Sequence, residues 1–314
     1  MGGDRSENCE HTVGTRALTY LCPMWTSDHP AAKWLAHDLA AAGLRWAVVS
    51  PGSRNAPLVL AFHHHPSIEL VVAVDERSAA YIALGLALKN NTPAAVICTS
   101  GTAAVNFGPA IAEAFHQGVP LLAITADRPV SAIGKGHGQT VNQSNLFQAH
   151  TNFQTVLDES ALSEFEMRAI ISTCWQQAAR GSVHVNVPFE EPLYGLVRAE
   201  EEALPTPAVD LASNQVLLPQ PDIAADAKIL LLLGPRAHDV RRSIPPSWSE
   251  RMVVIADAFS GWFGGESSGD RWWRNRGGWL PDAVLTVGAP PMSKALRNGL
   301  QKAGARHIHI GPSP

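Results

Sequence analysis

Ser50-Pro-Gly-Ser-Arg-Asn-Ala-Pro-Leu58 is the stretch of sequence that most directly indicates the fold. It continues an apolar, β-branched run, so we expect a strand over 46–50 that ends in a turn built from Pro and Gly. A strand, a tight turn and the start of a helix form half of a βαβ unit. Two later stretches repeat this arrangement after their own apolar runs, namely Asp75-Glu-Arg-Ser-Ala79 and Thr99-Ser-Gly-Thr-Ala103.

Short apolar runs alternate with longer stretches of helical period along the rest of the chain. Runs that are almost continuously apolar are typical of strands buried on both faces of a parallel sheet. The fold class predicted is therefore α/β, with two doubly wound parallel-sheet domains. The expected strands are 46–50, 70–75, 94–100, 121–127, 183–187, 229–233, 253–257, 283–287 and 307–310, and the expected helices are 31–42, 77–89, 103–116 and 164–180.

Domain boundaries follow from length and composition. A chain of 314 residues predicts about two domains. Between 196 and 222 the sequence turns to Glu200-Glu-Glu202 followed by several prolines, without sustained periodicity, which indicates a linker. We therefore expect an N-terminal extension over 1–26, a first domain over 27–195 and a second domain over 223–314.

Charge and composition exclude several classes of protein. The net charge is −4 and no broad stripe of Lys and Arg is present, so nucleic acid is not an expected partner. The four cysteines form no Cys-x-x-Cys pair, which argues against a zinc site and against a disulfide framework. The sequence contains no apolar run long enough to predict a signal peptide or a membrane span. A reducing cytoplasm is the expected location.

Candidate functional groups follow four of the predicted strands. In open parallel sheets, ligands bind beyond the carboxyl ends of the strands. The groups expected at this edge are 50–54, Glu76, 100–102 and 127–128. A single such loop can serve turning and helix capping alone. Four at one edge of one sheet predict a binding site.

The chemistry expected at this edge combines one acid with several cations. Burial behind the apolar strand would raise the pKa of Glu76, although a lone Glu at this position can also simply complement a helix dipole. Arg54, Arg128 and Lys294 suit carboxylate ligands, and Gln139 could hydrogen-bond a carboxylate or a hydroxyl. Each of these cations could equally be a solvated surface group. Together they predict a substrate with several carboxylates.

Three further features carry weaker signals. The Trp-rich segment 261–280 is either a loop that packs on its own domain, which we favour, or a binding loop or subunit contact. His63-His64-His65 favours solvated surface over a metal site, because adjacent residues point in different directions. The glycines of 134–138 lack the spacing and the preceding strand of a dinucleotide-binding fingerprint.

These motifs together resemble a family of thiamine diphosphate enzymes, the 2-succinyl-5-enolpyruvyl-6-hydroxy-3-cyclohexene-1-carboxylate synthases of the menaquinone or phylloquinone pathway. The likeness extends from about residue 27 to the end of the chain. It rests on Ser-Pro-Gly-Ser-Arg at 50–54, Asp-Glu-Arg-Ser-Ala at 75–79, Cys-Thr-Ser-Gly-Thr-Ala-Ala at 98–104, Thr-Ala-Asp-Arg-Pro at 125–129, Gln139 with Asn142-Gln143, and Pro-Pro-Met-Ser-Lys ending at Lys294.

The resemblance implies a pyrimidine-binding domain followed by a central Rossmann-like domain. It further implies that decarboxylated 2-oxoglutarate is joined to isochorismate, with the cofactor as electron sink. Glu76 would be the catalytic residue that activates the cofactor through the pyrimidine N1′. A homodimer or homotetramer is implied, with active centres between subunits. Pro51, Gly52 and Thr102 would also contact the cofactor, and Ser53, Arg54, Arg128, Gln139 and Lys294 would bind substrate.

One departure from the family bears on activity. Its members carry a third domain, which would hold the diphosphate and Mg²⁺ (or Mn²⁺), and this chain ends after the second. The only approach to the expected Gly-Asp-Gly motif is Gly269-Asp270-Arg271 with Asn298, which lacks the third glycine and a leading strand. We therefore expect an N-terminal portion that has no metal site, binds thiamine diphosphate weakly and is inactive alone.

Two alternatives to this function remain open. The chain could be a non-catalytic remnant that binds carboxylates or has a regulatory role, or it could belong to another thiamine-dependent carboligase of the acetolactate synthase type. Arg54 and Arg128 speak against the second, because a site for pyruvate has less use for several cations.

Overall fold

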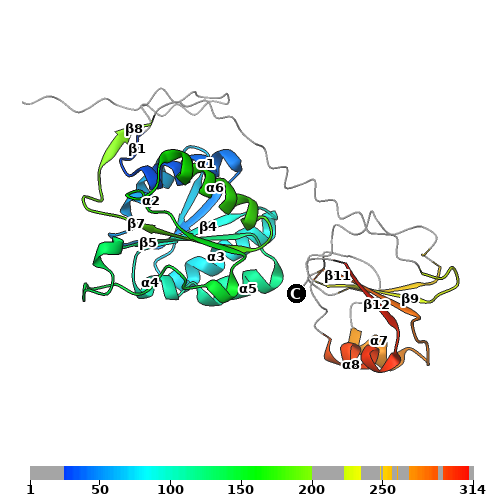
Figure 1. The fold of residues 1–314 in the computed structure, drawn as a ribbon. Helices are drawn as coiled ribbons and strands as arrows, with labels where there is room; N and C mark the ends of the chain where they lie inside the picture. The colour runs from blue at the N-terminus through cyan, green and yellow to red at the C-terminus, as the bar shows by residue number, and fades with distance from the viewer. Residues whose placement is uncertain are drawn as a thin grey trace, which may run out of the picture.

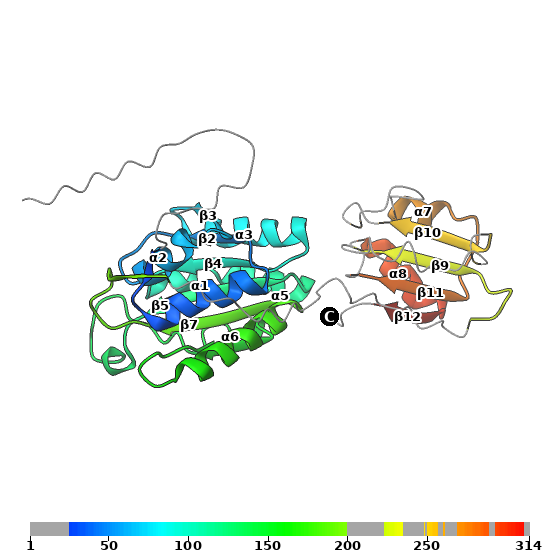
Figure 2. The same ribbon diagram turned by 90° about the horizontal axis from the view of Figure 1, so that it is seen from above.

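The computed structural model describes residues 25–199, 223–234, 248, 250–256, 260, 269–288 and 293–310. These residues form two α/β units (Figures 1 and 2). The predicted extension before residue 25, the predicted linker from 200 to 222, and Trp262 lie outside the described residues.

The first unit contains a six-stranded sheet in which every neighbouring pair of strands is parallel. The strand order is β3-β2-β4-β5-β7-β6. The first of these strands in the sequence, β2, therefore lies inside the sheet, and later strands extend the sheet toward both edges. The strands are β2 (Trp46–Val49), β3 (Glu69–Val72), β4 (Ala94–Cys98), β5 (Leu121–Asp127), β6 (Phe153–Val156) and β7 (Ser182–Pro188).

Helices cover both faces of this sheet (Figure 1), as the apolar strands predicted. Helices α1 (Pro30–Ala42), α2 (Ala56–His64) and α6 (Glu164–Ala178) pack on one face, and α3 (Glu76–Asn90), α4 (Thr102–Val105) and α5 (Gly108–Gln117) pack on the other. Two 3₁₀ turns, η1 (Val130–Ala132) and η2 (Gln148–His150), lie between β5 and β6. Every residue of β4, β5 and β7 is buried, so burial on both faces is confirmed for the central strands.

The edge strand β3 differs from the prediction of a strand buried on both faces over 70–75. It ends at Val72, which is 63% exposed, and Val74 just beyond is 83% exposed. The apolar run alone could not reveal this exposure, because the sequence of a strand does not show whether the strand has neighbours on both sides or lies at an edge. Figure 2 shows β3 at the outer edge of the sheet, beside α3.

The predicted helix over 103–116 is in fact two helices, α4 and α5, which are separated at Asn106 and Phe107. Pro109 causes this break, because it has no N–H to donate and is tolerated only in the first turn of a helix. Accordingly, α5 begins at Gly108 and places Pro109 in that turn.

Four helices and strands of the first unit were not predicted from the sequence. Helix α2 follows the Ser50–Asn55 turn directly and takes Pro57 into its first turn, and β6 is only half-buried. The segment Leu196–Arg198 forms β8, which pairs antiparallel with β1 (Trp25–Ser27). The predicted linker 196–222 therefore begins with a strand. Short strands of three residues carry too little periodicity to be recognised in a sequence.

The second unit is a smaller parallel sheet in the order β10-β9-β11-β12. Its strands match the predicted runs closely, and Trp272, Trp273 and Trp279 pack against one face of the sheet. Those three rings therefore favour the interpretation of the Trp-rich segment as packing on its own domain. The elements are β9 (Ile229–Leu233), β10 (Met252–Ala256), α7 (Gly269–Asn275), β11 (Ala283–Val287), α8 (Lys294–Ala303) and β12 (Arg306–Ile310).

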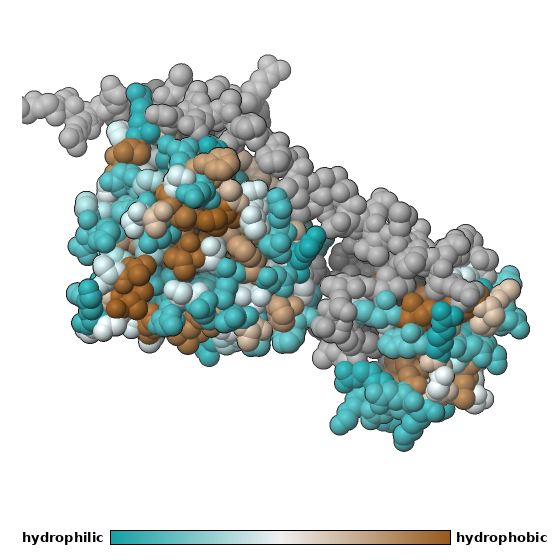
Figure 3. All heavy atoms as spheres, viewed as in Figure 1, coloured by the Kyte–Doolittle hydropathy of each residue, from teal (hydrophilic) through white to brown (hydrophobic). Residues whose placement is uncertain are grey.

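The surfaces of the described parts are of mixed character. On the face seen in Figure 3, apolar side chains of the first unit alternate with hydrophilic ones. Among the described helices, none has both the length and the apolar character needed to cross a membrane.

Candidate active site

The carboxyl ends of β2, β3, β4 and β5 bring the predicted site residues of the first unit to one edge of its sheet, which we call the rim. The strands are adjacent and parallel, and the register pairs Val49 with Ile97 and Cys98 with Thr125. The loops that follow these strands must therefore lie side by side. Those loops carry Pro51, Gly52, Ser53, Arg54, Glu76, Thr102 and Arg128.

Glu76 is the first residue of α3 and is half-buried at the rim. The preceding Asp75 caps the helix, because its carboxylate accepts a hydrogen bond of 2.7 Å from the Ser78 N–H. Glu76 also lies close to the end of β4: burial raises the pKa of the Cys98 thiol, and the negative charge of Glu76 adds to that rise. The exposed Val72 and Val74 do not enclose Glu76, so the apolar pocket expected around it is not formed by this edge of the sheet.

The loop after β2 is shaped by a close contact with β4. A Cβ atom on Gly52 would lie 2.4 Å from the Cβ of Thr99, so only glycine fits at this position. The Asn55 amide donates to the carbonyl of Ser50 at 2.9 Å and closes the loop. Ser50 Oγ and Asn55 Oδ1 are both buried and have no hydrogen-bond partner among the described residues.

Substituting Gly52→Ala is expected to destabilise the first unit by about 1–3 kcal/mol, the usual cost of overpacking, and to displace the loop that carries Arg54. Gly85→Ala is the matched control, since Gly85 lies in α3 with nothing within 4 Å of the added Cβ. There the substitution should stabilise by about 0.5–1 kcal/mol. Urea unfolding of both variants measures the difference, and equal effects would contradict the contact with Thr99.

Arg54 is buried, with 7% of its surface exposed, and it is already engaged. Its guanidinium donates to the Phe189 carbonyl at 3.0 Å and to Glu191 Oε1 at 3.0 Å. Arg54 thus links the end of β2 to the segment after β7. The Glu191 side chain is 73% exposed, so the carboxylate of a ligand could replace it as the partner of the Arg54 guanidinium. Glu191 was not predicted from the sequence, although a carboxylate shortly after an apolar strand is the same signal that selected Glu76.

Arg128 contacts the segment that carries Gln139, beside the turn that follows β4. Arg128 Nε donates to the Gly138 carbonyl at 2.9 Å. Gly101 has a φ of +85°, and a Cβ there would lie 2.9 Å from the Gln139 carbonyl oxygen. Gln139 itself adopts a φ of +57° and is exposed, as is Thr102. The structure therefore places Arg128, Gln139 and Thr102 together at the rim.

Lys294 lies elsewhere in the fold, as the exposed first residue of α8 in the second unit. The Gly-Asp-Arg sequence at 269–271 begins α7, where Asp270 accepts a hydrogen bond from the Ser293 hydroxyl. Within the described ranges, no group of three or more His, Cys, Asp or Glu side chains is arranged to hold a metal ion.

A layer of buried polar side chains lies beneath the rim, and of its members only Asp127 was among the groups expected at this edge from the sequence. Asp127 is 0% exposed, and burial raises the pKa of its carboxyl, opposed by hydrogen bonds from Asn186 and the Arg128 N–H and by the charges of Arg128 and Arg54. His184 is also 0% exposed, and its burial lowers the imidazole pKa to about 4. The other members of the layer are Thr125, Gln143 and Asn186.

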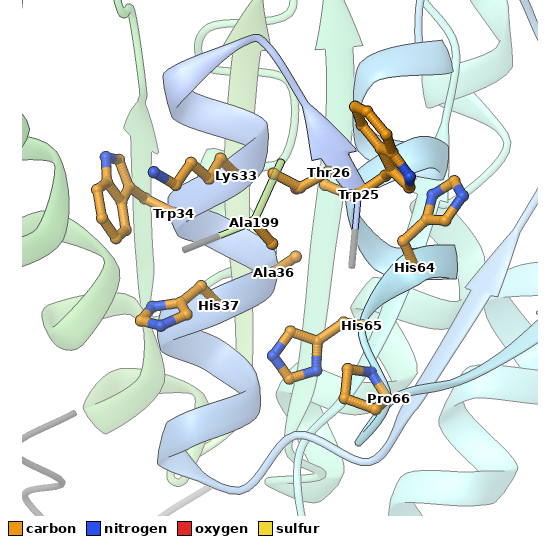
Figure 4. A pocket seen from close by; sticks show the side chains of 11 residues that line it. Trp25, Thr26, Lys33, Trp34, Ala36, His37, His64, His65, Pro66 and Ala199 are labelled. Atoms are coloured by element: carbon orange, nitrogen blue, oxygen red, sulfur yellow. The ribbon is translucent and has the colours of Figure 1, made fainter. Parts of the chain in front are cut away.

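A separate hollow lies between α1, α2 and the β1–β8 pair (Figure 4), with a volume of about 50 Å³. Trp25, Trp34 and His65 line it, and His64 and His65 are only partly exposed, so the His63–His65 run is not wholly solvated. Organic ligands usually occupy roughly 300–1,000 Å³. The hollow is too small for such a ligand, and none of the rim residues lines it.

Comparison with known proteins agrees with this geometry. Residues 30–147 match the family described as thiamine pyrophosphate enzyme, N-terminal TPP binding domain. This part of the chain is therefore similar to the N-terminal domain of thiamine pyrophosphate enzymes. The matched range contains the whole rim from Pro51 to Gln139, and the predicted α/β class is confirmed.

Curated relatives narrow the resemblance further. The chain is 43% identical over 191 residues to a protein of Desulfotalea psychrophila, covering 59% of this chain and 36% of the relative. It is 33% identical to a protein of Natronomonas pharaonis, covering 89% of this chain and 55% of the relative, and 35% identical to one of Staphylococcus epidermidis, covering 88% and 52%. All three are named 2-succinyl-5-enolpyruvyl-6-hydroxy-3-cyclohexene-1-carboxylate synthase. The resemblance predicted from the motifs is thus confirmed. The chain spans about half the length of the two relatives that match most of it.

The rim residues fit the pyrimidine end of thiamine diphosphate. Glu76 offers a half-buried carboxyl group, which is the type of group that can hydrogen-bond a ring nitrogen. Gly52 and Gly101 bring bare backbone to the same edge, and Ser50 Oγ and Asn55 Oδ1 are polar atoms there with unused hydrogen-bonding capacity. A carboxyl group beside bare backbone is the kind of arrangement that can receive an aminopyrimidine ring.

Proposed function

We propose that this protein acts as a carboligase that joins decarboxylated 2-oxoglutarate to isochorismate, with thiamine diphosphate and Mg²⁺ (or Mn²⁺) as cofactors. The product would be 2-succinyl-5-enolpyruvyl-6-hydroxy-3-cyclohexene-1-carboxylate, on the route to menaquinone or phylloquinone. The observation that carries the proposal is the meeting of Glu76, Arg54, Arg128 and Gln139 at one rim, in a chain whose relatives bear this synthase name.

Within this proposal, 27–195 is the pyrimidine-binding domain and 223–314 is the central domain. Thiamine diphosphate, when bound, supplies a nucleophilic carbon and an electron sink for decarboxylation. Glu76 would hold a proton at the pyrimidine N1′, and Pro51, Gly52 and Thr102 would contact the ring. The rim loops pack closely at Gly52 against Thr99 and at Gly101 against Gln139, and this packing would limit the access of water to one side of the ring.

The substrates are proposed to bind through the cations and polar groups of the same rim. Arg54 and Arg128 would take carboxylates, with Glu191 giving way at Arg54, and Ser53 and Gln139 would orient hydroxyl or carboxylate oxygens. Lys294 would contribute from the central domain. Two guanidinium groups at one rim favour a substrate pair with several carboxylates over pyruvate.

The protein is also proposed to form a homodimer or homotetramer in which a second copy covers α3. Both sides of this helix are apolar: Ala79, Ala80 and Ala83 are buried, while Tyr81, Ile82 and Leu88 are 46%, 41% and 40% exposed. A helix that is apolar all round is normally buried all round. Because Glu76 begins the same helix, the covering subunit would also supply the enclosure that Glu76 lacks.

Ile82→Glu is expected to weaken self-association at least tenfold, because it places a carboxylate in the middle of the apolar stripe. Phe165→Glu on α6 is the matched control, since Phe165 is 82% exposed on the other face of the sheet. Sedimentation velocity over a range of concentrations gives the association constants. A wild-type chain that stays monomeric, or equal effects of the two substitutions, would refute this interface.

The cytoplasm is the proposed location. Cys98 and Cys174 are buried free thiols, which is typical of proteins kept in a reducing compartment.

The proposed reaction can be tested with the purified chain, alone and together with the remaining region of the Staphylococcus epidermidis relative added as a second polypeptide. Thiamine diphosphate and Mg²⁺ are present throughout, and mass spectrometry identifies the product. The expected product forms from 2-oxoglutarate with isochorismate and not from pyruvate alone. A product from pyruvate alone would indicate an acetolactate-type carboligase. Carboxylate binding without turnover in either arrangement would indicate a non-catalytic remnant.

A further inference from the structure

The buried polar layer beneath the rim is a connected hydrogen-bond network centred on Gln143. The Gln143 side chain is 0% exposed, and its Oε1 accepts a hydrogen bond of 2.7 Å from the Gly101 N–H. Its Nε2 donates to the Ala126 carbonyl at 3.0 Å and to Asn186 Oδ1 at 2.8 Å. One carboxamide thus reaches the turn after β4, the end of β5 and a side chain of β7.

Asn186 extends the network to the end of β5. Its Oδ1 accepts a second hydrogen bond, of 2.8 Å, from Thr125 Oγ1, and its Nδ2 donates to Asp127 Oδ2 at 2.8 Å. The other oxygen of Asp127 accepts from the Arg128 N–H at 2.7 Å. A continuous path of hydrogen bonds therefore runs from the Gly101 amide to the backbone of Arg128.

The chemistry of the groups fixes the direction of every bond in this path. The Gly101 N–H can only donate, so the oxygen of the Gln143 carboxamide must face it. Thr125 donates its hydroxyl proton to Asn186, so it accepts from His184 Nε2, 2.8 Å away, and His184 is the Nε2–H tautomer. The network therefore has one arrangement, and the carboxamides of Gln143 and Asn186 cannot flip without opposing two donors or two acceptors.

The network joins two rim loops at points beyond the paired backbone of the sheet. The register of β4 and β5 ends at Cys98 and Thr125, and both Gly101 and Arg128 lie past it. Buried polar groups of this kind are not needed for stability, since apolar side chains of similar volume often serve as well. Their presence here points to a requirement for geometry.

We propose that Gln143 and Asn186 are positioning residues that fix the spacing between the Gly101–Thr102 turn and the start of the loop that carries Arg128. The inference rests on the proposed function, in which the turn faces the cofactor and Arg128 binds a substrate carboxylate. Gln143 and Asn186 touch neither ligand. They act by holding the two loops in a single relative position.

The first test follows both loops by NMR in the full chain without ligand. Gln143→Met keeps the length of the side chain and removes its three hydrogen bonds. It is expected to shift the Gly101 amide and the Arg128 Nε–H signals together and to increase hydrogen exchange at the Gly101 amide. The matched control is Ser182→Ala, which removes a hydrogen bond of 2.7 Å from the buried Ser182 to the His150 carbonyl at the opposite end of β7. The proposal is overturned if the Arg128 signal does not move, or if Ser182→Ala moves both signals equally.

The second test uses the carboligation assay. Gln143→Met is expected to lower kcat about 100-fold per folded molecule, because a shift of about 1 Å between reacting groups can cost that much. Ser182→Ala should lower the thermal midpoint and leave kcat unchanged. An unchanged kcat in Gln143→Met overturns the positioning role. If the wild-type protein has no turnover, the proposed function fails, and the NMR result alone then decides whether Gln143 holds the two loops together.

Discussion

Glu76→Gln is expected to lower the kcat of carboligation by about 1,000-fold or more while leaving the fold intact. A positioned acid or base commonly contributes 10²–10⁴-fold to catalysis, and in the proposed function Glu76 alone exchanges a proton with the cofactor. The amide of Gln can still hydrogen-bond the pyrimidine ring but cannot release or take up that proton. The loss should therefore appear in kcat, with little change in the amount of cofactor bound.

The fold should survive because Glu76 is not the residue that starts α3. Asp75 caps the helix through its bond to the Ser78 N–H, and this contact is untouched by the substitution. Glu164→Gln is the matched control, since Glu164 is likewise the first residue of a helix, α6, behind the capping residue Ser163. Steady-state kinetics and circular dichroism of both variants provide the comparison. Turnover near that of wild type in Glu76→Gln would remove Glu76 from its proposed role.

His184 should make the first unit sensitive to acid, with a loss of roughly 3 kcal/mol of stability between pH 6.5 and pH 4. Burial lowers the imidazole pKa from 6.5 to about 4 in the folded protein. Between these two pH values the unfolded chain therefore binds a proton that the folded protein does not bind. The stabilisation is complete above pH 6.5 and is lost as the pH falls toward 4. Hydrogen exchange in peptides from β5 and β7, corrected for intrinsic rates, measures this slope.

His184→Gln should remove most of this pH dependence, since an amide keeps a donor for Thr125 and does not titrate. His63→Gln, at an exposed position of α2, should leave the slope unchanged. A slope that persists in His184→Gln would assign the acid sensitivity to another group.

His29 is expected to change the stability of the first unit with pH in the opposite direction to His184. Burial opposes protonation, but its ring nitrogens face two acceptors, Glu159 at 2.6 Å and the Pro192 carbonyl at 2.9 Å, and the net effect is a raised pKa. Its contribution is therefore complete below pH 6.5 and is lost as the pH rises through the folded pKa.

Local patterns in the sequence were reliable where one strand or turn carries its own signal. The apolar runs that became β4, β5 and β7 predicted burial on both faces, because only the middle of a parallel sheet accommodates such runs. The Pro and Gly residues after β2 and β4 predicted tight turns, and Gly52 and Gly101 occupy positions where a Cβ would collide with a neighbouring segment. The break between α4 and α5 was missed, although Pro109 carried the signal.

Partners brought together from distant parts of the chain were not predictable in the same way. Arg54 was expected as a free cation, but it is buried and paired with Glu191, which lies 137 residues away in the sequence. The run that precedes Glu76 was expected to be enclosed, but β3 is an edge strand with exposed valines. Both differences depend on which strands are neighbours, and no local pattern encodes that.

The sequence by itself determined the α/β class, the limits of the main strands and the family, because hydrophobic periodicity and turn residues act over a few positions and the motifs are contiguous. Only the tertiary structure decided which of the rim groups are already paired, which edge of the sheet is left uncovered, and how Gln143, Asn186 and Asp127 link the loops. The reason is physical: hydrogen bonds and burial depend on distances in space, and strands far apart in the chain set those distances only after they have paired.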